Sequence, residues 1–396
     1  MKALQFLCIM AKNIKEGELM RSLVIYAGGS SVWIGGVYYA KNIAFQLALN
    51  EKITSAYKIY LCVPREYVGE FDALPPVVQV IPFRPLPGKL VSIQKLLFCI
   101  TRKAKFVLYG GSRFLKLFGI TRMKWIPDFQ EKYMPELFSV KELRGRDNSH
   151  KAAAASSEPL VLSSYAALKD FQKFYGNDKK DVIVMPFVSY IEPILEGSSP
   201  ASQSIILLKH GLEGVRYACV MNQFWQHKNH KVVVEALKKY YNKCPDSKLF
   251  IVFTGKLWDY RNPEYVREIE TALSTQPLRD HVKLLGFISR EDQIIIMKHS
   301  EFVIQPSLFE GWSTVVEDAK VLDKTVLLSD IPVHREQKNS KCIIFDPHNP
   351  SELADLIASE SMKTHHDDPA KGITDMYERA KEYTESFVHY LLNEEA

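Results

Sequence analysis

Short runs of β-branched and apolar residues alternate with amphipathic stretches along nearly the whole chain, and this alternation limits the choice of folds most. Strands that alternate with helices form parallel sheets, because a helix must return the chain between two parallel strands. We therefore predict an α/β fold. The predicted strands are 22–26, 58–63, 77–83, 123–127, 160–164 and 182–187 in the first half, and YACVMN, KLFIVFTG, VKLLGF, EFVIQPS, TVLLSD and CIIFDP in the second.

The alternation stops once, at the Pro-, Gly- and Ser-rich segment 190–203, a composition typical of a linker. We therefore predict two doubly wound domains that face each other across a cleft. Residues 141–158 are charged and small, and we predict a surface loop there. From Gly372 apolar residues recur every three or four positions, which predicts a last amphipathic helix. The predicted divisions are an extension (1–20), a first domain (21–190), a linker (191–204), a second domain (205–370) and the last helix (371–396).

The bulk features favour a cytoplasmic protein. The start, MKALQFLCIMAK, is similar to a signal peptide, but no small-residue cleavage site follows, which predicts an unprocessed extension. The six cysteines are scattered without a C-x-x-C pair, a pattern that favours reduced thiols over a disulfide framework. No apolar run reaches the about 18 residues that a membrane span needs.

Positive charge is concentrated in residues 73–127. This segment has ten Lys or Arg residues, interleaved with apolar residues, and no acid, whereas the net charge of the whole chain is only +5. Such a segment predicts an anionic partner, which could be a phosphate-bearing ligand, lipid headgroups or nucleic acid. The alternative is a solvated basic face on helices.

Two loops that follow predicted strands contain residues suited to a phosphate or a sugar. In AGGSSVWIGGVYYAKN, Gly35 and Gly36 open a helix, so a ligand could approach backbone amides there; the alternative is a tight turn. The loop fits neither G-x-G-x-x-G nor the Walker pattern, which argues against a dinucleotide-dependent oxidoreductase. In the second domain, Lys228 precedes a helix, where it could neutralise a diphosphate.

The stretch PSLFEGWSTVVEDAK places three acids near one predicted helix start. Thr314 and Glu317 fit a capping box, so Glu317 has a structural explanation. Glu310 precedes Gly311 in the loop, and Asp318 is not needed for the cap, so both are free to accept hydrogen bonds from hydroxyls. Amides near Ser313 and Thr314 could bind phosphate oxygens. Phosphate, ribose and sugar together describe a nucleotide-sugar.

The frame Glu310-Gly311-Trp312 with Asp318 at its ninth position, followed by TVLLSDIPVHREQ, resembles GT-B glycosyltransferases of family 4, the retaining group 1 type. The resemblance covers most of the chain from about residue 22. It implies two Rossmann-like domains, with the last helix crossing back to the first. It also implies that Glu310 lies by the donor sugar and that Asp318 binds the ribose hydroxyls, with Gly311, Trp312, Ser313 and Thr314 in the donor site.

Other segments carry the same resemblance. IGGVYYAKN is similar to the glycine loop near donor and acceptor, which contains Gly35 and Gly36, and WIPDFQEKYMPELFS places Asp128 in the cleft. Lys228 matches the lysine that binds the donor phosphate. The family usually has Arg where this chain has Gln223, and Arg261 is a candidate substitute; Pro127 stands where the family frequently has His. Backbone near Phe287 and Ile288 is expected to contact the base.

The resemblance therefore implies transfer of a sugar from a nucleotide-sugar to a hydroxyl of a glycan or a lipid-linked saccharide, with retention. We expect no cofactor, no metal and no nucleic acid, with Glu310, Lys228 and Asp128 as the catalytic residues. The basic segment 73–127 suggests an anionic membrane surface as a further partner. The alternatives are a non-catalytic sugar- or nucleotide-binding module and a sugar-nucleotide epimerase or phosphorylase on the same fold.

Overall fold

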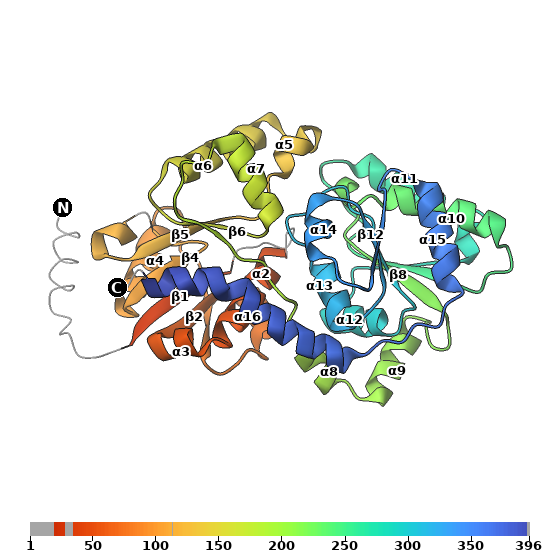
Figure 1. Ribbon diagram of the computed structural model, residues 1–396, viewed down its shortest axis with the longest axis horizontal. Coiled ribbons are helices and arrows are strands. Elements are labelled where there is room, and N and C mark those ends of the chain that lie inside the picture. The colour runs from red at the N-terminus through yellow and green to blue at the C-terminus, as the bar shows by residue number, and fades with distance from the viewer. Residues whose placement is uncertain (1–19, 28–34, 113, 394–396) are drawn as a thin grey trace.

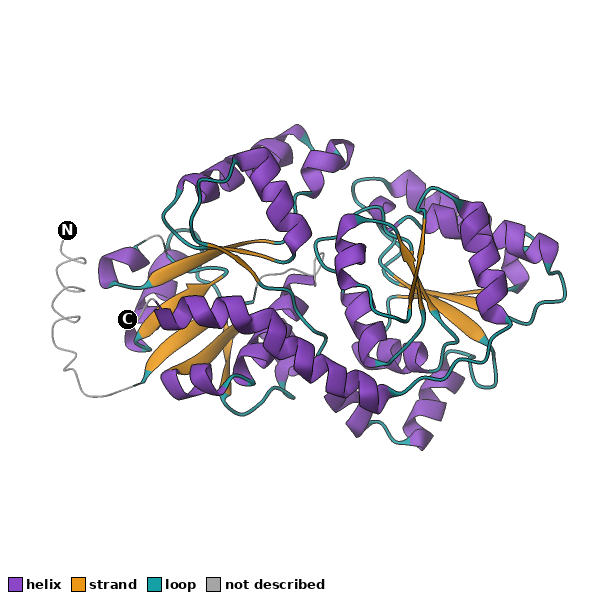
Figure 2. Cartoon of the chain, viewed as in Figure 1, coloured by secondary structure: helices purple, strands orange, loops and turns teal. Residues whose placement is uncertain are grey.

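A computed structural model describes residues 20–27, 35–112 and 114–393, and it contains two parallel sheets (Figures 1 and 2). The first sheet has seven strands in the order β3-β2-β1-β4-β5-β6-β7, and the second has six in the order β10-β9-β8-β11-β12-β13. Both sheets reverse their strand order beside the first strand, so each is doubly wound. The predicted α/β fold is confirmed. The predicted extension, residues 1–20, lies outside the described residues except for Met20.

The strands follow the predicted apolar runs closely, with one exception. The chain also forms β4 between residues 104 and 108, which the sequence analysis did not predict because its apolar run is only three residues long and follows Lys103 and Lys105. The strands are β1 (Arg21–Tyr26), β2 (Tyr57–Pro64), β3 (Val78–Phe83), β4 (Ala104–Leu108), β5 (Thr121–Ile126), β6 (Leu160–Leu162), β7 (Val182–Val184), β8 (Tyr217–Met221), β9 (Phe250–Thr254), β10 (Val282–Gly286), β11 (Val303–Gln305), β12 (Val326–Ser329) and β13 (Cys342–Phe345).

Helices cover both faces of each sheet. On the first sheet, Leu23 and Ile25 face a core that includes α2, whereas Val24 and Tyr26 face α4. The helices are α2 (Gly35–Ala48), α3 (Glu51–Ala56), α4 (Leu90–Thr101), α5 (Gln130–Tyr133), α6 (Val140–Ala155), α7 (Tyr165–Tyr175), α8 (Glu192–Gly197), α9 (Pro200–Lys209), α10 (His230–Lys243), α11 (Pro263–Leu273), α12 (Arg290–Lys298), α13 (Thr314–Val321), α14 (Pro332–Gln337), α15 (Pro350–Ser361) and α16 (Pro369–Asn393), with short 3₁₀ turns η1 (Arg65–Phe71), η2 (Leu115–Phe118), η3 (Pro135–Leu137), η4 (Gln226–Lys228) and η5 (Leu278–Asp280). Among the described residues, no helix combines the length and the apolar character needed to cross a membrane.

Two segments differ from the sequence prediction. The predicted surface loop at 141–158 is mostly the helix α6, which Ser139 and Glu142 start with a complete capping box. Only His150 and Ala153 of α6 are buried, so the helix lacks the apolar stripe that a periodicity argument needs. The predicted linker contains α8 and the start of α9, where Ser199 caps the helix and Pro200 occupies its first position.

The helix α16 connects the two halves of the molecule. It packs against α13 of the second domain and then against α2 and β7 of the first, and Figure 1 shows it (blue) crossing the first sheet. Its Phe387 and Leu391 are fully buried in the core around Leu23 and Ile25, and the hydroxyl of Tyr57 donates to the Leu391 carbonyl at 3.4 Å. The predicted last helix therefore exists and returns to the first domain.

Candidate active site in the cleft between the domains

A cavity of about 1270 Å³ lies between the two domains. Loops at the carboxyl ends of strands from both sheets line it, as expected for a ligand site in open α/β sheets. Its volume exceeds that of a typical drug-sized pocket, about 300–1000 Å³. The predicted site residues that line it are Gly35, Asp128, Gln223, Lys228, Arg261, Phe287, Ile288, Glu310, Gly311, Trp312, Ser313, Thr314 and Asp318. Gly36 is buried in the first turn of α2 and is not among the lining residues.

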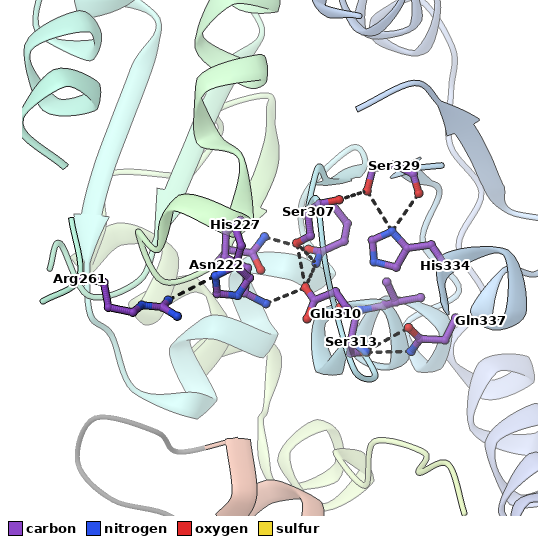
Figure 3. A network of polar contacts seen from close by, with 12 residues as sticks. Asn222, His227, Arg261, Ser307, Glu310, Ser313, Ser329, His334 and Gln337 are labelled. Carbon is purple, nitrogen blue, oxygen red and sulfur yellow. Dashed lines mark hydrogen bonds and ion pairs between the residues drawn. The ribbon is translucent and has the colours of Figure 1, made fainter. Parts of the chain in front are cut away.

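Glu310 is held by one of its two carboxylate oxygens. Its Oε1 accepts hydrogen bonds from Lys228 Nζ at 2.6 Å, Ser307 Oγ at 2.8 Å and Gln305 Nε2 at 2.9 Å. Gln305 in turn accepts from Asn222 Nδ2 at 2.8 Å, so the end of β8 also fixes this carboxylate (Figure 3). Among the described residues no hydrogen bond reaches Oε2, which leaves that oxygen available to a ligand.

Lys228 reaches Glu310 because the loop after β8 is tied to the loop after β11. Asn229 adopts the left-handed conformation, with φ of 55°, which ends η4. Its side-chain amide donates to the carbonyls of Pro306 at 3.1 Å and Pro347 at 2.8 Å. Lys228 is mostly buried, and its ammonium group lies where an anionic group in the cavity would meet it.

Arg261 contacts His227, the residue that precedes Lys228 in the chain. One guanidinium nitrogen is 3.4 Å from His227 Nδ1, and Nε is 3.3 Å from Asp259 Oδ1. Burial and the neighbouring cations Lys228 and Arg261 hold the pKa of His227 well below its usual range, so the imidazole is neutral and can accept a hydrogen bond. Arg261 and Lys228 therefore both lie near His227 on the cavity wall, whereas Gln223, on the same wall, is uncharged.

Asp128 reaches the cavity from the first domain, directly after β5. Its Oδ1 accepts from the Gln130 amide at 3.0 Å, and burial raises its pKa, with Glu131 and Glu310 adding to the effect. The Glu310 loop lies against this segment so closely that a side chain at Gly311 would come within 2.6 Å of the Pro127 carbonyl oxygen. The lack of a Cβ at Gly311 therefore lets the two halves of the site meet.

Asp318 is fully buried, and both of its oxygens are engaged. Arg290 donates from Nη1 to Oδ2 at 2.7 Å and from Nη2 to Oδ1 at 2.5 Å, and the Ser189 hydroxyl donates to Oδ1. On its other side Arg290 lies 5.1 Å from the ring of Tyr38 in the first domain. The predicted ribose contact of Asp318 stays a prediction, and a ribose here would share the carboxylate with Arg290.

The capping-box hypothesis for Glu317 is wrong. The N-cap of α13 is Ser313, whose hydroxyl accepts from the Val316 amide. Glu317 is buried, and its Oε1 accepts from Lys320 at 2.9 Å and from Gln337 at 3.0 Å. Gln337 also accepts from the Ser313 amide at 3.0 Å, so that amide, which the sequence suggested for phosphate, already has a partner (Figure 3).

Sequence reasoning missed Gln305, Arg290 and His334, which the fold places around the acids. His334 is fully buried, with Nδ1 2.9 Å from the Ser329 carbonyl oxygen, and burial lowers its pKa to about 4. No local motif marks these residues, because their role depends on strands and helices that meet only in the folded chain.

Residues 206–382 match the family model described as Glycosyl transferases group 1. The second domain is a glycosyltransferase group 1 domain. This match includes Lys228, Arg261, Arg290, Glu310 and Asp318, so most of the second-domain wall of the cavity belongs to the group 1 domain.

Solved structures similar to the whole chain share its fold, and no curated protein sequence matches it. Anabaena HepE in complex with UDP and glucose has a TM-score of 0.63 at 15% identity, covering 94% of this chain and 99% of that one. A glycosyltransferase from Rickettsia africae has a TM-score of 0.65 at 15% identity, covering 94% and 97%. Sucrose-phosphate synthase from Thermosynechococcus elongatus has a TM-score of 0.65 at 12% identity, covering 94% and 98%. The chain therefore has the GT-B fold, with the group 1 domain as its second half.

Proposed function

We propose that this protein is a retaining family 4 glycosyltransferase that moves a hexosyl group from a nucleotide-sugar to a hydroxyl of a saccharide or a lipid-linked saccharide. The observation that carries the proposal is the Glu310–Lys228 pair in a group 1 domain, at 2.6 Å, beside a cavity shared with Asp128 of the first domain. We place the protein in the cytoplasm, acting in polysaccharide biosynthesis, with an acceptor at the membrane face. The Anabaena HepE structures contain UDP and UDP-glucose, which makes UDP-sugars the first donors to test.

The proposed chemistry uses charge and position and needs no covalent nucleophile. The bond between the anomeric carbon and the diphosphate breaks, and the acceptor oxygen bonds to that carbon on the same face. The acceptor proton passes to a diphosphate oxygen, so no cofactor or metal takes part in this scheme. Lys228 and Arg261 stabilise the departing diphosphate, because fixed cations act most strongly on charge that develops in a cavity shielded from water. Glu310 Oε2 and Asp128 accept hydrogen bonds from sugar hydroxyls.

A panel of UDP-, GDP- and ADP-sugars tests the donor site by thermal unfolding of wild type and Glu310→Gln. A ligand present at 100 times its Kd stabilises the folded state by about 2.7 kcal/mol. We expect one nucleotide class to raise the Tm of both proteins, and the further increment from its sugar to be lost in Glu310→Gln. Glu235→Gln is the matched control, because Glu235 also pairs with a lysine, Lys238 at 3.0 Å, but does not line the cavity.

If no sugar nucleotide changes the Tm of the wild type, the donor-site proposal is wrong. Gln223, at the position where the family usually has Arg, favours one other function, a module that binds a nucleotide-sugar without transferring it. Donor stabilisation without product from any saccharide acceptor would support that module. Conversion of the donor without an added acceptor would instead indicate an epimerase.

A further inference from the structure

The helix α4 presents an apolar ridge to solvent. Leu90, Ile93 and Leu97 follow one another at steps of three and four residues, so they lie on one side of the helix. Their exposed fractions are 53%, 47% and 40%, whereas Leu96 and Cys99 on the opposite side are buried against the first sheet. An amphipathic helix on a protein surface normally buries its only apolar stripe. The helix α4 has two apolar sides, one buried against the sheet and one exposed to solvent.

Two other segments on this face of the first sheet also expose leucines. Leu86, in the turn before α4, is 47% exposed, and Leu117 in η2 is 70% exposed. The two elements cover the same face of the first sheet, because Leu96 of α4 and Leu115 of η2 belong to one buried core with Val24 and Tyr26. We use the term α4 ridge for Leu86, Leu90, Ile93, Leu97 and Leu117.

Cations surround the α4 ridge. Arg84 and Lys89 lie in the turn before the helix, Arg102 follows its last residue, and Lys116 precedes Leu117; all four are exposed. Within the described residues no ion pair joins any of them to an acid. The whole segment 73–127 contains neither Asp nor Glu, so no acid of its own neutralises this charge.

We propose that the α4 ridge docks the protein onto an anionic lipid bilayer. Aliphatic side chains flanked by Lys and Arg are suited to an interface in which the apolar face enters the acyl boundary and the cations meet headgroup phosphates. Nucleic acid would be recognised by cations together with stacking aromatic or hydrogen-bonding side chains, whereas this ridge is made of Leu and Ile. A protein partner would not require the whole segment to lack acids.

The direction of the strands shows where the α4 ridge lies relative to the cleft. The turn before α4 follows β3 and the segment before η2 follows β4, and both strands run parallel to β5, which leads into Asp128. The start of the α4 ridge is therefore at the same end of the first sheet as the first-domain wall of the cavity. If the proposed transferase function holds, a docked protein would receive a lipid-linked acceptor from the side of the first domain.

Sedimentation of the full chain with vesicles tests docking without any assay of activity. We expect binding to vesicles of phosphatidylcholine with phosphatidylglycerol, weaker binding to phosphatidylcholine alone, and release as salt rises, because salt screens the cations. Leu90→Gln/Ile93→Gln should weaken partitioning by about tenfold or more, since two apolar side chains no longer leave water. The matched control is Ile205→Gln/Leu208→Gln on α9, an apolar pair of the same spacing with exposed fractions of 67% and 65%.

Equal loss of binding in both double variants, or none in either, would overturn the assignment to α4. Failure of the wild type to bind anionic vesicles at low salt would overturn docking itself, as would binding to RNA in place of vesicles. Thermal unfolding of each variant shows that it is folded. The sugar-nucleotide panel is independent of vesicles, so loss of the docking proposal leaves the donor-site proposal standing, and the reverse is also true.

Discussion

Glu310 illustrates how the site depends on single atoms. Three donors converge on its Oε1, from Lys228, Gln305 and Ser307, and together they fix the direction of the other oxygen. A lysine alone would leave the carboxylate free to rotate, because a point charge sets no orientation. The sequence predicted Glu310 and Lys228 as partners of one site, but Gln305 could not be recognised, because in sequence it is an ordinary residue of a buried strand.

A substitution at Asp128 should change the pH dependence of stability. The folded state raises the pKa of this carboxyl, mainly by burial, so its stabilising contribution is present at low pH and is lost as the pH rises through the folded-state pKa. At pH 7 the charged, buried carboxylate of Asp128 therefore lowers the free energy of unfolding of the wild type. Asp128→Asn removes this charge, while Asn can still accept a hydrogen bond from the Gln130 amide. We expect Asp128→Asn to be the more stable protein at pH 7, with the difference shrinking as the pH falls to about 4.

Urea unfolding of both proteins across this pH range measures that difference. Asp355→Asn serves as the control, because Asp355 is exposed and lies outside the cavity lining. A difference that grows toward acid pH would contradict the sign of the pKa shift. If Asp128 contacts the sugar, transfer should fall in Asp128→Asn even though the protein is more stable.

At the scale of elements, two helical glycines should respond in opposite ways to the same change. A Cβ at Gly372 in α16 would lie 2.2 Å from the Val321 carbonyl oxygen at the end of α13, whereas a Cβ at Gly145 in α6 would have nothing within 4 Å. Gly372→Ala should therefore force the two helices apart and cost about 1–3 kcal/mol. Gly145→Ala should stabilise the protein by about 0.5–1 kcal/mol, because Ala loses less backbone entropy in a helix.

Denaturant midpoints of these two variants against wild type measure the effect. Stabilisation by Gly372→Ala would mean that α16 does not lie so close to α13. Because Gly145 lines the cavity, its variant is compared only in stability.

Elements with a strong apolar pattern could be predicted from the sequence, and weakly patterned ones could not. The predicted helix around PEYVREIETAL is α11, whose buried residues are spaced at one side of the helix. The helix α6 was missed because it buries two residues and depends on its cap, although Ser139 and Glu142 carried a readable signal. The roles of Glu317 and Asp318 required the tertiary structure, since their partners Gln337, Arg290 and Ser189 come from other segments.

At the scale of the whole molecule, the structure shows the two domains joined across the cleft by specific hydrogen bonds. Trp312 Nε1 donates to the Phe187 carbonyl at 2.8 Å. The carboxylate of Glu336 accepts from the Tyr165 and Ala166 amides, at 2.9 and 3.0 Å, and so caps α7 from the opposite domain. Contacts of this kind hold a cleft closed, and they must break if the domains separate to exchange ligands.

Glu336→Ala should therefore favour a more open molecule. Hydrogen bonds to a charged group contribute about 1.5–3 kcal/mol each, so their loss is large enough to change the balance between closed and open forms. We expect a larger radius of gyration by small-angle scattering without ligand, and a return to the wild-type value with a bound donor. Glu352→Ala is the control, because Glu352 accepts from the Asp346 amide at 3.0 Å within the second domain. Scattering curves that coincide for all three proteins would contradict a closing role for Glu336.

The return of α16 to the first domain also determines when this protein can finish folding. Phe387 and Leu391, close to the last residues of the chain, complete the core that begins with Leu23 and Ile25. On the ribosome the first domain, which ends near residue 190, is synthesised well before α16, which begins at Pro369 and covers it. Its apolar face therefore stays uncovered while the second domain is made, although domains usually fold as units in order of synthesis. During translation this face is a natural target for a chaperone, and a truncation that removes only α16 would leave it exposed permanently.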